Sequence, residues 1–177
     1  MSKRKAEVTL LCEDSQHECF FLKLLRSRGR KYREIRVRRP NSSSGSAEQY
    51  VRDHFGPYTR AHRRRIVRGQ ASGLLAAIDA DTGTVQQHYD ELLSQLDPPR
   101  GGDEKIAVFV PRRNIETWIK YLGGEQVSET ARYPKLPQAR DCYPAVDRFL
   151  EIARTRVPSD CPDSLRRAIQ DEYPRLP

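Results

Sequence analysis

The chain has 177 residues and a net charge of +8, with 37% of its residues hydrophobic and 32% charged. This length fits one domain, with at most a small appended lobe, and is enough to bury a core. Because no apolar run is long enough to cross a bilayer and the N-terminus lacks the apolar run of a secretory signal, we expect a cytoplasmic protein without a membrane span.

The N-terminal region predicts a strand, a helix and a second strand. EVTLLC at residues 7–12 is typical of a short buried strand. The helix after it has Ser15 as its expected N-cap, Glu18 to complete a capping box and Gly29 to end it. YREIRV at residues 32–37 alternates between polar and apolar residues, which predicts a more exposed strand.

The rest of the chain continues the alternation of helices and strands. Residues 47–55 and 59–68 predict two separate helices, because Gly56 and Pro57 between them are typical helix breakers. Apolar periodicity then predicts, in chain order, a strand at 73–78, a helix at 85–96, a strand at 106–110, a helix from Asn114 to Leu122, and tail helices at 143–156 and 163–173.

Apolar strands that alternate with helices favour a parallel sheet covered on both faces. The expected fold class is therefore α/β, a sandwich with a mainly parallel four-stranded sheet, helices on both faces and C-terminal helices. We expect residues 1–125 to form this domain and residues 126–177 to form a helical extension packed on it. Ligands of such sheets bind beyond the carboxyl ends of the strands, so the strand ends are where a site is expected.

Most of the positive charge lies in the segment from Arg26 to Arg68. Fourteen Arg and Lys residues there face three acids, an excess of +11, while residues 1–25 balance at zero and residues 69–177 sum to −3. A basic segment of this kind indicates a surface that binds nucleic acid, although a solvated basic helix is the open alternative. Its expected phosphate contacts are Arg63, Arg64, Arg65 and Arg68.

Acids follow three of the apolar strands. Glu13 comes after the first strand, Asp79 and Asp81 come after the third, and Glu116 lies one short turn into the helix after the fourth. In a parallel sheet these carboxylates converge at one edge, where they repel unless a cation neutralises them. Carboxylate oxygens with room for waters and phosphates suit Mg²⁺ or Mn²⁺. The four acids are therefore the predicted metal ligands, whereas a simple turn or helix cap is the alternative for Asp79 and Asp81.

This pattern resembles the TOPRIM domain, the Mg²⁺-dependent catalytic fold of primases, topoisomerases and several small nucleases. Glu13 stands where the family has its first-strand glutamate, and Asp79-Ala80-Asp81 matches its Asp-x-Asp. The segment VPRRNIETWIKYL, residues 110–122, is similar to the Pro…Ile-Glu-x-Trp segment of small TOPRIM-like proteins associated with anti-phage defence. The resemblance covers residues 6–122, and the chain has Asp14 where the family usually has Gly.

The resemblance implies a Rossmann-like TOPRIM sandwich, a metal-dependent nuclease of DNA or RNA related to the overcoming-lysogenization-defect nucleases, and an ATPase partner subunit. In such a nuclease Glu13 would bind metal or act as general base. Lys120, one turn after Glu116, would stabilise developing negative charge or pair with Glu116 on the surface. Arg112 and Arg113 would hold flanking phosphates or be solvated.

Two other functions remain open from the residues. AAIDADTGTV, residues 76–85, also resembles the haloacid-dehalogenase phosphatase motif, but here the two aspartates follow the third strand rather than the first. A non-catalytic nucleic-acid-binding or assembly subunit with structural carboxylates is the other. There is no GxxxxGK[ST] loop, so the chain by itself is not expected to be an ATPase.

Overall fold

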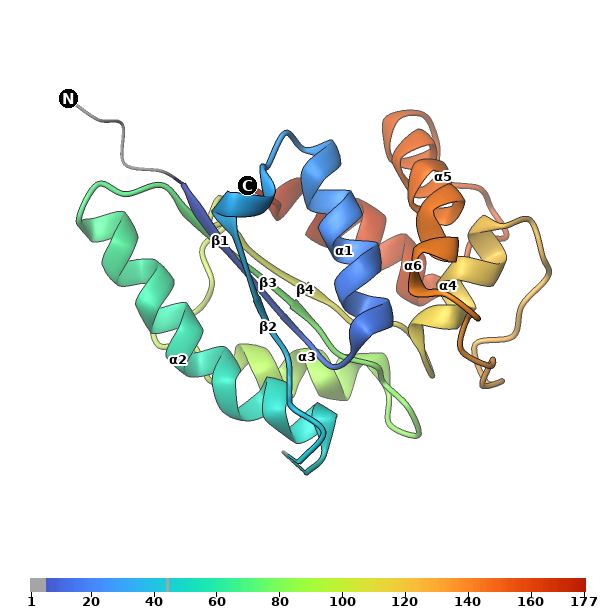
Figure 1. The fold of residues 1–177 in the computed structure, drawn as a ribbon, viewed down its shortest axis with the longest axis horizontal. Coiled ribbons are helices and arrows are strands. Elements are labelled where there is room, and N and C mark those ends of the chain that lie inside the picture. Colours follow the sequence, from blue (N-terminus) through green and yellow to red (C-terminus); the bar gives the residue numbers. More distant parts are fainter. Residues whose placement is uncertain (1–5, 44) are drawn as a thin grey trace.

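The structure, a computed structural model, describes residues 6–43 and 45–177. It contains one sheet of four parallel strands in the order β2-β1-β3-β4, with helices on both of its faces (Figure 1). The strands are β1 (Glu7–Cys12), β2 (Ile35–Arg38), β3 (Ser72–Ala77) and β4 (Ile106–Phe109). The predicted α/β fold, with a parallel four-stranded sheet and C-terminal helices, is confirmed.

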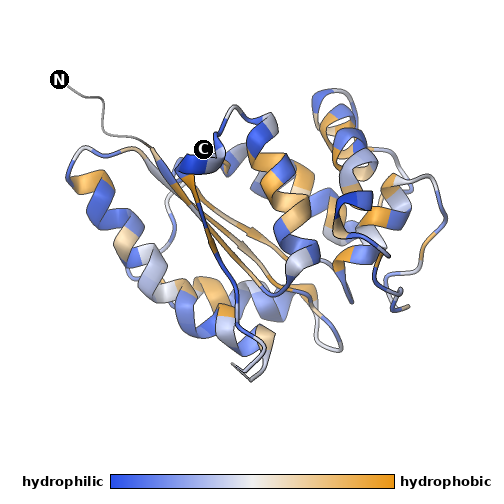
Figure 2. Cartoon of the chain, viewed as in Figure 1, coloured by the Kyte–Doolittle hydropathy of each residue, from blue (hydrophilic) through white to orange (hydrophobic). Residues whose placement is uncertain are grey.

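The helices form two layers, and each layer buries its own apolar core against the sheet. In β3, Leu75 and Ala77 face one core whereas Leu74 and Ala76 face the other, which explains why the strands are apolar without alternation (Figure 2). One layer consists of α1 (Ser15–Ser27), α4 (Ile115–Leu122), α5 (Tyr143–Arg154) and α6 (Asp163–Arg167), and the other of α2 (Ala47–Val67) and α3 (Val85–Leu93). In the described part of the chain, no helix is long and apolar enough to span a membrane.

The prediction of two helices separated at Gly56 and Pro57 is wrong, because α2 runs through both residues. A proline inside a helix normally disrupts the backbone hydrogen bonds around it. Here the side-chain amide of Gln95 supplies substitutes, since its Oε1 accepts from the Gly56 N–H at 3.2 Å and its Nε2 donates to the Arg52 carbonyl at 3.1 Å. A side chain inserted between residues 52 and 56 thus keeps the two halves in one helix.

Several other boundaries differ from the prediction. The N-cap of α1 is Asp14, not Ser15, because the Asp14 carboxylate accepts from the backbone N–H groups of Gln16 and His17. Residues 32–34 form a 3₁₀ turn before β2, and α3 ends at Leu93. The last predicted helix divides into α6, a π-helical turn at Ala168–Glu172 and a 3₁₀ turn at Tyr173–Arg175.

Side chains cover the outer edge of β4, the last strand of the sheet in the described part of the chain. The buried Glu172 carboxylate accepts from the Val108 N–H at 2.8 Å and forms two bonds with Arg100, at 2.6 and 3.0 Å. The Tyr89 hydroxyl donates to the Val108 carbonyl, and Arg100 donates to the Ile106 carbonyl. The C-terminal segment is therefore fastened to the sheet edge by a buried ion pair, and the edge is closed to further strands.

Glu172→Ala should destabilise the fold strongly, because it leaves the Arg100 guanidinium, 12% exposed, and the Val108 N–H without their acceptor. We expect the free energy of unfolding to fall by about 3–5 kcal/mol, as for other broken buried ion pairs. Chemical denaturation measures this change. Glu151→Ala, which breaks the exposed pair with Arg148, is the control and should have no measurable effect. An equal effect of the two substitutions would contradict the role given to Glu172.

Candidate functional site

The ends of β1 and β3 lie side by side and bring two predicted site residues into contact. Cys12 pairs with Ala77 in the β1–β3 ladder, so the residues that follow both strands emerge at the same edge of the sheet. The Asp79 N–H donates to Glu13 Oε1 at 2.7 Å. The structure therefore brings together Glu13 and Asp79, which are 66 positions apart in the chain.

The Asp-x-Asp segment extends the β3–β4 pairing beyond the strands. The N–H groups of Ile78, Ala80 and Asp81 donate to the carbonyls of residues 109, 111 and 113 at 2.8 to 3.0 Å. Asp81 then adopts a left-handed backbone with φ of 45°, a conformation that Asp tolerates better than most residues. This turn places Asp79 and Asp81 at one pocket, in which they have different partners.

His17, in the first turn of α1, lies between two carboxylates. The buried ring has Nε2 3.0 Å from Asp79 Oδ1 and Nδ1 3.3 Å from Asp14 Oδ1. Burial by itself would lower the pKa of His17, but the charges of Asp79 and Asp14 outweigh it and raise this pKa well above its ordinary value. The cationic form of His17 is therefore favoured at this position, between carboxylates from two strand ends.

A second cation reaches this edge from the C-terminal segment. Lys135 Nζ lies 2.7 Å from Asp14 Oδ2. Burial would raise the pKa of Asp14, but the hydrogen bonds from His17 and Lys135 hold it well below its ordinary value. The side-chain hydrogen bond to Asp14 in turn raises the pKa of Lys135.

Glu13 and Glu116 are the acids whose protonated forms are favoured. Burial raises the pKa of Glu13 to about 7, and the neighbouring Asp79 charge adds to the shift while His17 opposes it. Glu116 is 2% exposed; burial raises its pKa and repulsion from Asp79 and Asp14 raises it further. Among the described residues, Glu116 Oε1 has no hydrogen-bond partner. A proton or a cation would satisfy that oxygen.

The predicted role of Lys120 has no support in the geometry. Its ammonium group lies 3.2 Å from Glu125 Oε2 and 5.6 Å from the centre of the Tyr133 ring. The expected alternative, a surface pair with Glu116, is likewise replaced by the pair with Glu125.

A pocket of about 160 Å³ lies at these strand ends and is lined by both acidic and basic side chains. Its acidic residues are Glu13, Glu48, Asp79 and Asp81, and its cations are Arg113 and Arg132. Arg132 NH1 pairs with Asp81 Oδ1 at 3.1 Å. The start of α2 completes the lining, with Ser46, Ala47 and Glu48. Since backbone N–H groups and the helix dipole at this end favour anions, the pocket offers binding groups for both a cation and an anion.

The two arginines before α4 hold the neighbouring turn. Arg112 NH1 donates to the Gly83 carbonyl at 2.7 Å, and Arg113 NH1 donates to the Asp81 carbonyl at 3.1 Å. Arg113 also lines the pocket. Of this predicted pair, Arg113 is therefore the one placed to meet an anion there.

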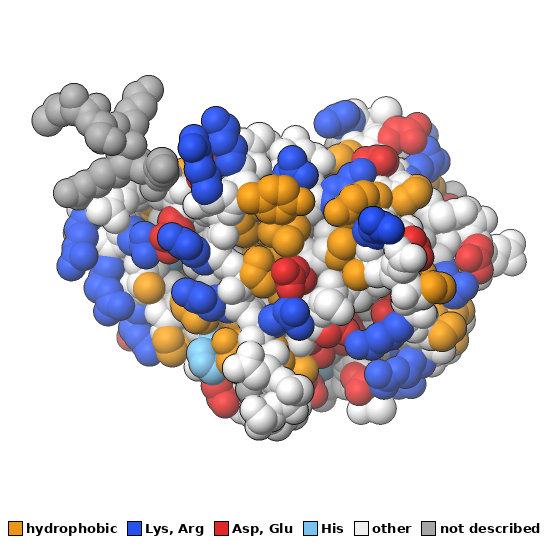
Figure 3. All heavy atoms as spheres, viewed as in Figure 1, with side chains coloured by type: hydrophobic (Ala, Val, Ile, Leu, Met, Phe, Trp, Pro, Cys, Tyr) orange, Lys and Arg blue, Asp and Glu red, His pale blue; other side chains and the backbone are white. Residues whose placement is uncertain are grey.

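The basic end of α2 that the sequence predicts to bind phosphates lies at the other end of the strands, where β1 and β4 begin. Arg65 pairs with Glu7 at the start of β1, and Arg63 pairs with Glu104 just before β4. At 1.5 Å per residue, the 21 residues of α2 separate Arg64 and Arg68 from the pocket by roughly 25–30 Å. Figure 3 shows blue side chains along this end of α2. Two of these four arginines thus pair with glutamates that lie far from the pocket.

The predicted metal ligands and catalytic residues did not include Asp14, His17, Arg132 or Lys135, although the sequence places Asp14 with Glu13 after the first strand and His17 close enough to Glu13 to touch the site. Asp14 and His17 lie within four positions of Glu13, and their closeness was the available signal. Arg132 and Lys135 lie in an irregular segment after α4 and approach the strand ends only in the folded chain. Compared with protein-family models, curated proteins and solved structures, the chain gives no match. The resemblance to TOPRIM nucleases therefore stays a prediction.

Glu13→Gln should flatten the dependence of stability on pH. With a pKa near 7 in the fold and an ordinary value of 4.5, Glu13 holds a proton in the folded chain that the unfolded chain releases. Stability therefore falls as pH rises from 4.5 to 7, by about 3 kcal/mol from this group alone. Urea unfolding in metal-free buffer at several pH values measures it. The control Glu125→Gln, at an exposed carboxyl, should keep the wild-type slope, and parallel profiles for Glu13→Gln and wild type would contradict the assignment.

Proposed function

We propose that the protein is a Mg²⁺-dependent nuclease that hydrolyses phosphodiester bonds of DNA or RNA at the pocket between Glu13, Asp79 and Arg113. The observation that carries the proposal is the mixed charge of this pocket. Carboxylates from two adjacent strand ends meet there with two arginines and the start of a 21-residue helix. A metal ion and a phosphate are the pair of ligands that such a lining suits.

The donor groups fit a hard divalent cation by their chemistry. The contacts described above use Oε1 of Glu13 and Oδ1 of Asp79, so their second oxygens, with the unpartnered Glu116 Oε1, would hold the ion. In residues 6–43 and 45–177, no three His, Cys, Asp or Glu side chains already form a group that could hold a metal. Binding would therefore draw these carboxylates together, and Asp81 would join by releasing Arg132.

The protein groups around the pocket have separate tasks in this proposal. Arg113, Arg132 and the first N–H groups of α2 would bind and orient the scissile phosphate. In its alternative role, with Asp79, Asp81 and Glu116 as the metal ligands, Glu13 would be the general base that accepts the proton of the attacking water. His17 and Lys135 offset the negative charge that remains when no ion is bound. A bound Mg²⁺ would polarise the phosphate and lower the pKa of the water.

We extend the proposal to the biological role and the partner that the resemblance to TOPRIM nucleases implies. A TOPRIM-like nuclease with an ATPase partner would act as the effector of an anti-phage defence system in the cytoplasm. The order of the acids, one glutamate after β1 and Asp-x-Asp after β3, supports this assignment. The chain itself has no phosphate-binding GxxxxGK[ST] loop, so ATP hydrolysis would belong to the partner.

Asp79→Asn and Glu13→Gln should each reduce cleavage of labelled nucleic acid by about a hundredfold or more, while Mg²⁺ or Mn²⁺ is present. Both substitutions keep the side-chain shape and remove a charge. EDTA should abolish cleavage by the wild type. Asp90→Asn, on the exposed side of α3, is the matched control and should cleave normally. Gel analysis of single- and double-stranded DNA and RNA measures the activity, and calorimetric titration with Mn²⁺ measures the ion.

Two results would contradict the proposal in different ways. Unchanged nucleic-acid binding with no cleavage in any metal, and no Mn²⁺ binding, would favour a non-catalytic binding or assembly subunit. Release of phosphate from small phosphoesters, with a phosphorylated Asp79, would favour the phosphatase.

A further inference from the structure

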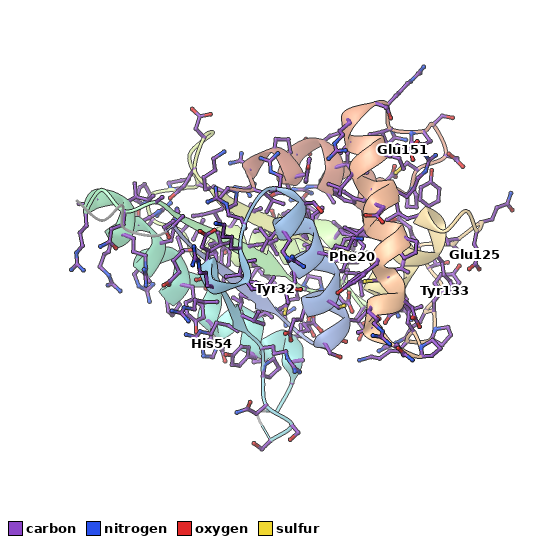
Figure 4. The ribbon with its side chains drawn as sticks, turned by 45° about the horizontal axis from the view of Figure 1, so that its top comes forward. Phe20, Tyr32, His54, Glu125, Tyr133 and Glu151 are labelled. Carbon is purple, nitrogen blue, oxygen red and sulfur yellow. The ribbon has the colours of Figure 1, made fainter. Side chains whose placement is uncertain are left out.

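A second pocket, of about 270 Å³, lies on the outer side of α1 and has no part in the carboxylate site. Its floor consists of Lys23, Arg26 and Ser27, which lie three and four positions apart on one side of the helix. Tyr32, from the 3₁₀ turn after α1, and Tyr143, the first residue of α5, complete the lining. Figure 4 shows Tyr32 on one side of α1 and α5 on the other.

Both tyrosines expose apolar rings that the fold has not buried. Tyr32 is 55% exposed and Tyr143 is 38% exposed, and they are among the few large hydrophobic side chains on the described surface. Figure 3 shows hydrophobic side chains next to Lys and Arg side chains over this part of α1. Exposed aromatic rings beside cations are the usual composition of surfaces on which nucleic-acid bases stack.

A cationic side chain lies over the ring of each of the two tyrosines. The Arg26 guanidinium lies 4.2 Å from the centre of the Tyr32 ring, and NH1 of Arg26 donates to the Tyr32 hydroxyl at 3.1 Å. The Lys23 ammonium lies 4.7 Å from the centre of the Tyr143 ring. Lys23 also pairs with the exposed Asp147, whereas no acid among the described residues pairs with Arg26. Arg26 is therefore the positive charge available to an anion.

We propose that this pocket binds one unpaired nucleotide of a single-stranded nucleic acid. The base would stack against the Tyr32–Arg26 pair or the Tyr143 ring, and Arg26 would hold the phosphate next to it. The volume is slightly below the about 300–1,000 Å³ of pockets that enclose a whole drug-sized ligand, so one nucleotide of a longer strand suits it. A base paired in a duplex cannot offer its face to a tyrosine, which selects single strands.

Binding of a nucleotide in this pocket does not depend on the nuclease function. Only the conclusion that the pocket defines the substrate of the nuclease rests on the proposed function. The carboxylate site lies at the start of α1, where His17 contacts Asp79. Lys23 and Ser27 lie six and ten positions beyond His17, about 9 and 15 Å further along the helix. With stacked nucleotides ~3.4 Å apart along one strand, a nucleotide in the pocket would sit about three or four nucleotides from the cleaved bond. The pocket would therefore define the substrate of the nuclease as a single strand.

Tyr32→Ala and Arg26→Gln should each weaken binding of a short fluorescein-labelled oligothymidylate by about 5- to 150-fold, the cost of losing one stacked base. Fluorescence anisotropy in EDTA measures the dissociation constant without cleavage. Tyr32→Phe should bind nearly as the wild type because it retains the ring. Arg154→Gln, at the exposed far end of α5, removes the same charge away from the pocket and should change binding much less. Thermal melting checks that each variant is folded.

Two further binding measurements distinguish a single strand from a duplex and from a free nucleotide. Binding of the matching duplex should be equal in wild type and Tyr32→Ala, and thymidine monophosphate should fail to displace the oligonucleotide at equal concentration. Equal single-strand binding by wild type, Tyr32→Ala and Arg26→Gln would overturn the proposal, as would displacement by the free nucleotide. The oligonucleotide should still bind to Asp79→Asn. An inactive wild type with intact, Tyr32-dependent binding would thus disprove the nuclease but not the pocket.

Discussion

The crowding of carboxylates at the ends of β1 and β3 is the constraint on which the rest of the site depends. Parallel pairing places Glu13 beside the Asp79 backbone, and Asp14 and Glu116 add further acids at the same edge. Such a group is costly in a partly buried position unless protons or cations offset its charge. The chain supplies both. Burial raises the pKa of Glu13 to about 7, which favours its protonated form, and the raised pKa of His17 favours a cation between Asp14 and Asp79.

The segment after α4 has a function beyond covering the sheet. It brings Arg132 and Lys135 to the acids of two strand ends, and its last part brings Glu172 to the free edge of β4. The C-terminal helices share one hydrophobic core with α1 and β1. Arg132 and Lys135 therefore depend on packing of a segment more than 100 positions away from the first strand. The sheet and the C-terminal segment form a single structural unit for the purpose of this site.

Periodicity in the sequence was sufficient to predict four parallel strands and the meeting of Glu13 with Asp79, because each acid directly follows an apolar run. It was insufficient where a distant side chain decides the outcome. The continuity of α2 depends on Gln95, which no local pattern around Pro57 reveals. Lys135 lies 121 positions from its partner Asp14. Local signals thus predict the elements and their strand-end acids, whereas the compensating contacts arise only from tertiary packing.

Basic residues that lie close together in the sequence are distributed over separate surfaces of the fold. The excess of +11 between residues 26 and 68 suggested that the end of α2 meets the nucleic acid. In the fold, Glu7 and Glu104 engage two of its arginines at the edge of the sheet opposite the carboxylates. Arg26 belongs to the same segment but lies on α1, the helix that starts at the carboxylate site. Under the two proposals, a strand bound along α1 would reach the acids, whereas one bound only at the end of α2 would not.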